Sequence, residues 1–241
     1  MSKIETAMIL AAGFGTRMRP LTLTTPKPLV EIFGKPMLLR NLQILQNAGI
    51  KKVIVNIHYL GEKIADYIAQ QKFDGMDIII SDEREQLLDS AGGIIKALPL
   101  LGDQPFFVMN SDSFWVDYLQ SNLLRLADFF DGDKMDMAML VVPRLAAPGN
   151  ERGDFLIDDD SRLKRAPAFV DNSVIYPGCF ILNPQILDRG NLEPHSLNHY
   201  FDKAIANNRL YGLPLLGDWY TAGTMDMIKV VEDLMKSRHQ G

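Results

Sequence analysis

The stretch TAMILAAGFGTRMR (residues 6–19) joins a short apolar run to a loop that carries two glycines and two arginines. The run Thr6–Leu10 has the length of a buried β-strand. Glycines allow backbone N–H groups to approach a ligand closely, and arginines add charge that matches phosphate oxygens. We therefore predict a strand followed by a phosphate-binding loop, formed by Leu10, Ala11, Ala12, Gly13, Gly15, Thr16 and Arg17.

Two well-known glycine-rich loops do not match this one. A dinucleotide-binding loop needs a third glycine where Met18 stands, and an acidic residue after the second strand, where the chain has Asn56 and His58. A P-loop needs a Gly-Lys-Ser/Thr sequence, which does not follow here. A plain turn is the remaining alternative, and Arg17 and Arg19 beside the glycines argue against it.

Lys27 follows this loop and lies between Pro26 and Pro28. Proline fixes its own backbone angle φ and restricts the residue before it, so Lys27 is expected on a stiff segment. Such a segment loses little conformational entropy when a ligand binds. We predict that Lys27 is a preorganised phosphate ligand.

Short apolar runs alternate with amphipathic stretches through the first part of the chain, a pattern typical of βαβ units and a mostly parallel sheet. We predict an α/β fold class, with a Rossmann-like mostly parallel sheet flanked by helices. The predicted strands are Thr6–Leu10, Lys52–Ile57, Asp77–Ser81, Phe106–Asn110 and Met137–Val142, and the predicted helices lie between Pro36 and Gly49 and at Gly61–Gln70, Ala91–Leu98 and Leu119–Phe130.

The rhythm changes after Pro143, where prolines and glycines separate short strand-like runs such as Val174–Leu182. This composition predicts a β-rich lobe laid over the sheet, followed by helices at Leu197–Asn207 and Thr224–Lys236. We expect one domain over residues 1–241, with a first part at 1–143 and a second part at 144–241.

Asp112 follows the predicted strand Phe106–Asn110, so its carboxylate is expected at the carboxyl edge of the sheet, where ligands of open α/β sheets bind. Mg²⁺ prefers one or two carboxylates together with substrate phosphates, which makes Asp112 a candidate metal ligand. Helix capping is its alternative role. The segment Leu88–Gly93 has small residues that leave room for a flat base, although Asp89 or Ser90 could simply cap a helix.

The composition excludes several kinds of partner. With 25 basic and 30 acidic residues and a net charge of −5, the chain has no basic surface expected to bind duplex nucleic acid or an anionic membrane. No apolar run reaches the roughly 18 residues that a membrane helix needs. The single cysteine, Cys179, cannot form an internal disulfide and is expected to be packed. We expect a cytoplasmic protein.

The string LAAGFGTRM (residues 10–18), with PKPL at 26–29, resembles the signature of the sugar-1-phosphate nucleotidyltransferases. The likeness continues through AGGI (91–94), NSD (110–112), RGDF (152–155) and Trp219 with Gly223 and Thr224, so it covers nearly the whole chain.

This resemblance implies a nucleoside triphosphate and a sugar 1-phosphate as partners and Mg²⁺ as cofactor, in a monomer or a homo-oligomer. It implies that Arg17 and Lys27 are catalytic and that Asp112 holds the metal. It adds nucleotide contacts from Ala91, Gly92 and Asn110, and sugar-pocket positions at Asn110, Gly153 and Gly178. It also implies that residues 1–143 form the nucleotide-binding part and residues 144–241 the sugar-binding part of a single catalytic domain.

One position departs from the family. Where its members read Trp-x-Asp-x-Gly-Thr, with the aspartate as a second metal ligand, this chain has Thr221, and Asp218 or Asp226 could replace that carboxylate. The overall resemblance favours UTP and N-acetylmuramate 1-phosphate as substrates, with a role in peptidoglycan recycling. The alternatives are guanylyl transfer to mannose 1-phosphate or heptose 1-phosphate, and a non-catalytic protein that senses nucleotide sugars.

Overall fold

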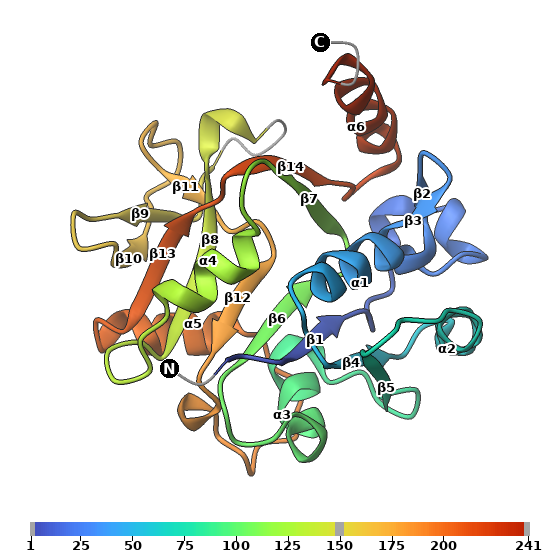
Figure 1. Cartoon of the computed structure of the whole chain (residues 1–241), viewed down its shortest axis with the longest axis horizontal. Helices are drawn as coiled ribbons and strands as arrows, with labels where there is room; N and C mark the ends of the chain where they lie inside the picture. Colours follow the sequence, from blue (N-terminus) through green and yellow to red (C-terminus); the bar gives the residue numbers. More distant parts are fainter. Residues whose placement is uncertain (1–2, 148–151, 239–241) are drawn as a thin grey trace.

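The computed structural model describes residues 3–147 and 152–238. The strands of its main sheet are β1 (Thr6–Leu10), β4 (Lys52–Ile57), β5 (Asp77–Asp82), β6 (Phe106–Asn110), β8 (Met137–Pro143), β9 (Phe155–Ile157), β10 (Leu163–Arg165), β11 (Val174–Ile175), β12 (Cys179–Leu182) and β13 (Leu210–Pro214). Within these ranges the strand order is β10-β9-β11-β8-β12-β6-β1-β4-β5, with β13 paired to β8 (Figure 1). The helices are α1 (Met37–Asn47), α2 (Gly61–Ala69), α3 (Asp89–Leu101), α4 (Asn122–Phe129), α5 (Asn198–Ala206) and α6 (Met225–Arg238).

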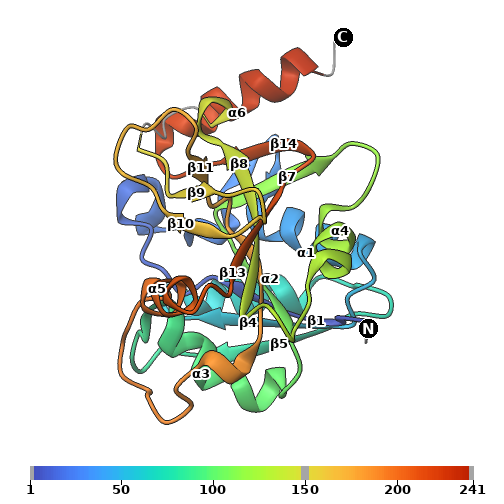
Figure 2. The same cartoon turned by 90° about the vertical axis from the view of Figure 1, so that its left-hand side faces the viewer.

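One half of the sheet, β5-β4-β1-β6, is parallel, and α1, α2 and α3 connect its strands. Successive side chains of a strand point to opposite faces. Accordingly, Ala7 and Ile9 pack in the core formed with α1, α2 and α4, while Met8 packs in the core formed with α3 and α5. Figure 2 shows α4 and α5 on opposite sides of the sheet. Burial on both faces explains the uninterrupted apolar runs, and the predicted α/β class is confirmed.

The other half of the sheet is mixed. β12 lies between β6 and β8 and is antiparallel to both, and β11, β9 and β10 extend the sheet beyond β8. The expectation of a β-rich lobe laid over the sheet is therefore wrong in its placement, because these strands continue the same sheet. The predicted run Val174–Leu182 is broken at Tyr176–Gly178, since Pro177 has no N–H to donate and Gly178 has a φ of 93°.

Several strands were not predicted individually. β7 (Ser113–Asp117) pairs antiparallel with β14 (Gly217–Thr221) in a separate two-stranded sheet, and Thr221 lies opposite Ser113. The short strands β2 (Glu31–Ile32) and β3 (Lys35–Pro36) form another pair. Helix α4 begins later than the predicted Leu119, because the Ser121 hydroxyl accepts a hydrogen bond from the Leu124 N–H and caps the helix there.

Cys179 is buried and free, which confirms the expectation of a packed cysteine, and burial raises the pKa of its thiol. In the described part of the chain, no helix combines the length and the apolar character required to cross a membrane.

Candidate active site

Three adjoining clefts lie at the carboxyl edge of the parallel strands. β1 pairs with β6 so that Leu10 lies opposite Asn110, and the segments that follow both strands therefore emerge side by side. Asn110 lines all three clefts. The first cleft has a volume of about 290 Å³, and the predicted site residues that line it are Leu10, Ala11, Gly13, Gly15, Thr16, Arg17, Lys27, Asn110 and Asp112.

Gly15 shows why the loop after β1 requires glycine. Its φ is 62°, in the left-handed region, and a Cβ atom there would lie 3.0 Å from Lys27 Cβ and 3.1 Å from Thr22 Cγ2. The Thr22 hydroxyl donates a hydrogen bond of 2.8 Å to the Gly15 carbonyl. Close packing against this glycine brings the Lys27 segment up to the phosphate-binding loop.

Lys27 and Asp112 form an ion pair in the first cleft, with 2.6 Å between Lys27 Nζ and Asp112 Oδ2. Their side chains are 13% and 30% exposed, so both remain within reach of a ligand. The two groups that the sequence singled out for phosphate and for metal thus lie in direct contact.

The second cleft also has a volume of about 290 Å³ and shares Arg17, Asn110 and Asp112 with the first. Its remaining lining includes Asp154, Tyr176, Gly178, Trp219 and Thr221. Gly178 lines this cleft, whereas Gly153 does not. A Cβ atom on Gly153 would lie 2.0 Å from Ser173 Oγ, so this glycine permits close packing behind the cleft.

Asp154 is a cleft residue that was not predicted individually. Burial raises the pKa of its carboxyl group, and the Tyr176 N–H, which donates a hydrogen bond of 2.9 Å to Asp154 Oδ2, offsets part of that rise. Its place directly after Gly153 in the RGDF motif was the available signal.

The third cleft has a volume of about 400 Å³ and is lined by Leu10, Ala12, Gly13, Asn56, Leu87, Asp89, Ser90, Asn110 and Pro194. Ala91 and Gly92 lie behind this lining: the Ala91 N–H donates to the His195 carbonyl at 3.0 Å, and a Cβ on Gly92 would lie 3.0 Å from the Glu193 carbonyl oxygen. Asn56 was missed, although a polar residue near the end of a buried strand was the available signal.

The Asn56 side chain holds the start of the phosphate-binding loop, because its Oδ1 accepts a hydrogen bond of 2.7 Å from the Ala11 N–H.

The helix-capping alternative for Ser90 does not hold in its simple form, because the Ser90 hydroxyl accepts a hydrogen bond from the Leu197 N–H on another segment. Asp89 has a φ of 57° and its Oδ1 accepts from the Ser90 N–H.

Thr221 lies beside Asp112, since its hydroxyl donates to the Asp112 carbonyl oxygen at 3.3 Å. Of the two nearby carboxylates, Asp218 accepts from the Tyr118 hydroxyl at 2.5 Å and Asp226 is in the first turn of α6, and neither lines a cleft described above. Among the described residues, no group of three His, Cys, Asp or Glu side chains is arranged to hold a metal ion. The donor set that remains, one carboxylate beside a phosphate-sized cleft, fits Mg²⁺ only when substrate phosphates supply further ligands.

A glycine-containing loop, two cationic side chains and a carboxylate at this edge of the sheet are the features expected of a phosphate-binding α/β protein. A family model described as nucleotidyl transferase matches residues 6–228. The chain belongs to this family, and the resemblance seen in its motifs is confirmed.

Two kinds of relative are similar to this chain. An N-acetylmuramate alpha-1-phosphate uridylyltransferase of Caulobacter vibrioides is 34% identical over 220 residues, which make up 90% of this chain and 91% of that protein. The catalytic subunit beta of a mannose-1-phosphate guanylyltransferase of Drosophila melanogaster is 35% identical over 225 residues, which make up 90% of this chain and 59% of that protein. These identities do not separate uridylyl transfer from guanylyl transfer.

Solved structures share the fold. A UDP-glucose pyrophosphorylase complexed with UDP-glucose has a TM-score of 0.81 at 17% identity, covering 98% of this chain and 100% of that one. The inositol-1-phosphate CTP transferase from T. maritima has a TM-score of 0.75 at 19% identity, and the match covers 97% of this chain and 95% of that one. At such identities the likeness shows the fold alone.

Gly178 allows a prediction about the wall between the clefts. Its φ is 93°, and a Cβ there would lie 2.5 Å from Ser113 Oγ and 3.1 Å from Asn110 Cβ. Gly178→Ala is expected to lower the free energy of unfolding by about 2–4 kcal/mol, from backbone strain together with the collision. Gly34→Ala is the matched control, because its φ of 62° is also positive but open space surrounds it, and it should cost about 1 kcal/mol. Urea unfolding measures both, and equal losses would contradict the collision.

Proposed function

We propose that this protein transfers a nucleotidyl group from a nucleoside triphosphate to a sugar 1-phosphate, releasing pyrophosphate and forming a nucleotide sugar. The observation that carries the proposal is the sharing of Arg17, Asn110 and Asp112 by the first and second clefts. A triphosphate in the first cleft and a sugar phosphate in the second would meet at these side chains. The third cleft continues from Gly13 and Asn110 and would receive the base.

The proposed chemistry needs no protein base, because a sugar phosphate is already an anionic nucleophile near neutral pH. Its oxygen attacks the α-phosphorus in line, a new P–O bond forms, and the bond to pyrophosphate breaks. Charge grows on the phosphate oxygens and on the leaving group, and Arg17 and Lys27 would stabilise it. Catalysis then consists of alignment and charge neutralisation.

Mg²⁺ belongs to this proposal as a cofactor held by Asp112. When bound, it would neutralise phosphate charge and orient the triphosphate. Lys27 lies on the same carboxylate and limits how much negative charge Asp112 offers in the absence of nucleotide. We therefore expect weak metal binding to the nucleotide-free protein.

UTP and N-acetylmuramate 1-phosphate are the substrates we favour, on the strength of the resemblance along the whole chain to the uridylyltransferases. Peptidoglycan recycling in the cytoplasm is the corresponding role. Guanylyl transfer to mannose 1-phosphate or heptose 1-phosphate is the alternative, supported by relatives of similar identity. A nucleotide-sugar sensor is the second candidate function, favoured by Thr221 in place of a carboxylate.

A substrate panel tests this proposal directly. The purified protein with Mg²⁺ is offered each of four nucleoside triphosphates with each of the three sugar phosphates, and pyrophosphate release is measured. We expect UTP to give a higher kcat/KM than GTP in competition. A GTP preference would assign the protein to the guanylyl branch, while nucleotide-sugar binding without any pyrophosphate release would favour the sensor.

Lys27→Ala tests one of the two cations that the proposal assigns to the reacting phosphates. We expect kcat/KM to fall more than tenfold, equivalent to at least about 1.4 kcal/mol of transition-state stabilisation. Thermal stability should change little, because the pair with Asp112 is partly exposed. Lys134→Ala is the control, since Lys134 pairs with Asp131 at 2.9 Å on the surface. Unchanged turnover in Lys27→Ala would remove this residue from the site.

Thr221→Asp tests the metal site, because it restores a carboxylate beside Asp112. We expect it to lower the Mg²⁺ concentration that gives the half-maximal rate, while Asp112→Ala should nearly abolish activity. Thr24→Asp adds the same charge at an exposed position and should leave the Mg²⁺ requirement unchanged. The assignment is wrong if Asp112→Ala keeps most of its activity or if the wild-type protein binds Mg²⁺ tightly without nucleotide.

A further inference from the structure

Glu83 is a buried carboxylate that the proposed chemistry does not use. It directly follows β5, is 0% exposed and lines none of the three clefts. Burial raises the pKa of its carboxyl group, and hydrogen bonds from Asn56 and Leu88 offset part of that rise. No ion pair recorded among the described residues includes it. The charges of Lys96 and His58 also lower this pKa but rank below burial and the hydrogen bonds, so a carboxylate buried here without an ion pair is costly and its place in the fold calls for an explanation.

The first contact leads to the phosphate-binding loop. Asn56 Nδ2 donates a hydrogen bond of 2.7 Å to Glu83 Oε1, so the amide nitrogen of Asn56 must face Glu83. Its oxygen is thereby turned toward β1, where it accepts the Ala11 N–H at 2.7 Å. A flipped amide would place an NH₂ group against the Ala11 N–H. Glu83 therefore fixes the orientation of the side chain that holds the start of the loop.

The second contact leads to the third cleft. Glu83 Oε2 accepts a hydrogen bond of 3.2 Å from the Leu88 N–H, immediately before Asp89 and Ser90, which line that cleft. The backbone of Glu83 is also held, because its carbonyl oxygen lies 2.6 Å from His58 Nδ1. One carboxylate thus connects the first cleft, through Asn56, with the wall of the third, through Leu88.

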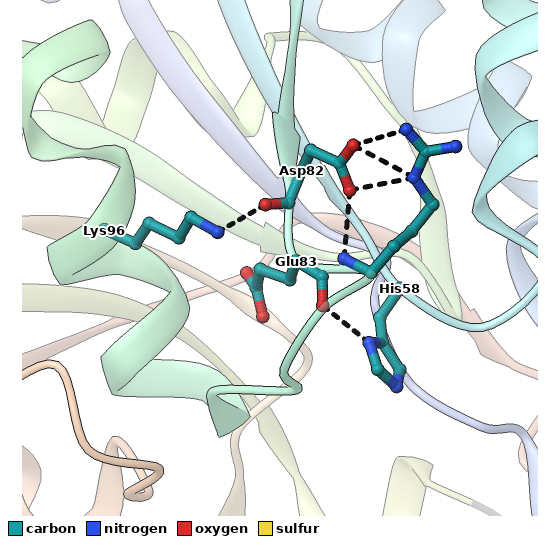
Figure 3. A network of polar contacts seen from close by, with 5 residues as sticks. His58, Asp82, Glu83 and Lys96 are labelled. Atoms are coloured by element: carbon teal, nitrogen blue, oxygen red, sulfur yellow. Dashed lines mark hydrogen bonds and ion pairs between the residues drawn. The ribbon is translucent and has the colours of Figure 1, made fainter.

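Gly93 confirms how closely α3 packs on this carboxylate. A Cβ atom at residue 93 would lie 2.5 Å from Glu83 Oε1 and 2.9 Å from Asn56 Nδ2. Only glycine leaves room for both polar groups there. The outer side of the same strand end is held separately, as Figure 3 shows, where Lys96 donates to the backbone oxygen of Asp82. Asp82 itself pairs with Arg84 at the surface.

We propose that Glu83 is a positioning residue for nucleotide binding, which sets the Ala11 N–H through Asn56 and the wall of the third cleft through the Leu88 N–H. This inference rests on the proposed function, in which the first and third clefts take the nucleotide. Glu83 touches neither substrate. Its effect is expected on nucleotide affinity and not on the sugar phosphate, because the second cleft does not depend on its contacts.

Glu83→Gln tests the proposal with a side chain of the same shape. An amide replaces one acceptor oxygen by an NH₂ group, which then faces either the Asn56 amide or the Leu88 N–H, and both of these are donors. If the Asn56 amide flips to accept from the new NH₂ group, its own NH₂ group faces the Ala11 N–H instead. We expect the Kd for the nucleoside triphosphate to rise about tenfold, with the KM for the sugar phosphate unchanged. UTP and GTP are each titrated with Mg²⁺ by calorimetry. Glu85→Gln, an exposed glutamate on the same loop, is the matched control and should bind like the wild type.

Gly93→Ala disturbs the same carboxylate from a different element and should weaken nucleotide binding in the same direction. It decides the question if Glu83→Gln does not fold, and thermal unfolding establishes which variants are folded. A merely structural role would lower the melting temperature and leave the nucleotide Kd of the folded protein unchanged. If the wild-type protein binds nucleotide and the folded variants bind it equally well, the positioning role alone is overturned. A wild-type protein that binds neither nucleotide overturns the proposed function and this role together.

Discussion

The pairing of β1 with β6 places Leu10 opposite Asn110, and the geometry of all three clefts depends on this register. Both strands end at the same edge of the sheet, so the glycine loop and the Asn110–Asp112 segment leave it side by side. For this reason Lys27 and Asp112, far apart in sequence, come within 2.6 Å of each other. A shift of one residue would also move every side chain of the strand to the opposite face, where it would no longer fit the core that it packs against.

Two carboxylates at this edge differ in their surroundings and therefore in what they can do. Asp112 is 30% exposed and has a cation partner, so it can exchange contacts when a ligand arrives. Glu83 is 0% exposed and is held by hydrogen bonds from a side-chain amide and a backbone N–H. Breaking either hydrogen bond would leave a buried polar group unsatisfied, so the Glu83 side chain is held in one position. The site thus combines an adaptable carboxylate with an inflexible one.

The parallel half of the fold was predictable because its strands are buried on both faces and read as continuous apolar runs, so β1, β4 and β6 match their predicted bounds. The contact between Lys27 and Asp112 was not predicted, because the sequence assigned one residue to phosphate and the other to metal without placing them together. β7 and β14 were not predictable, because each acquires its partner about a hundred residues away, as in the pair Ser113 and Thr221. The roles of Asn56 and Glu83 were not predicted for a similar reason, since neither residue belongs to a recognised motif and both act through contacts between segments distant in sequence.

The second half of the chain reaches the site by two long-range pairings. β12 inserts beside β6 and brings Gly178 next to Asn110, while β14 pairs with β7 and brings Thr221 next to Asp112. The second cleft is therefore lined by segments from distant parts of the chain, and Asp154 and Trp219 line it without lining the first cleft, whereas Gly223, which follows β14, lines both. In the proposed function, Asp154 and Trp219 are therefore the residues whose substitution would alter the choice of sugar phosphate with the least change to the loop proposed to hold the triphosphate.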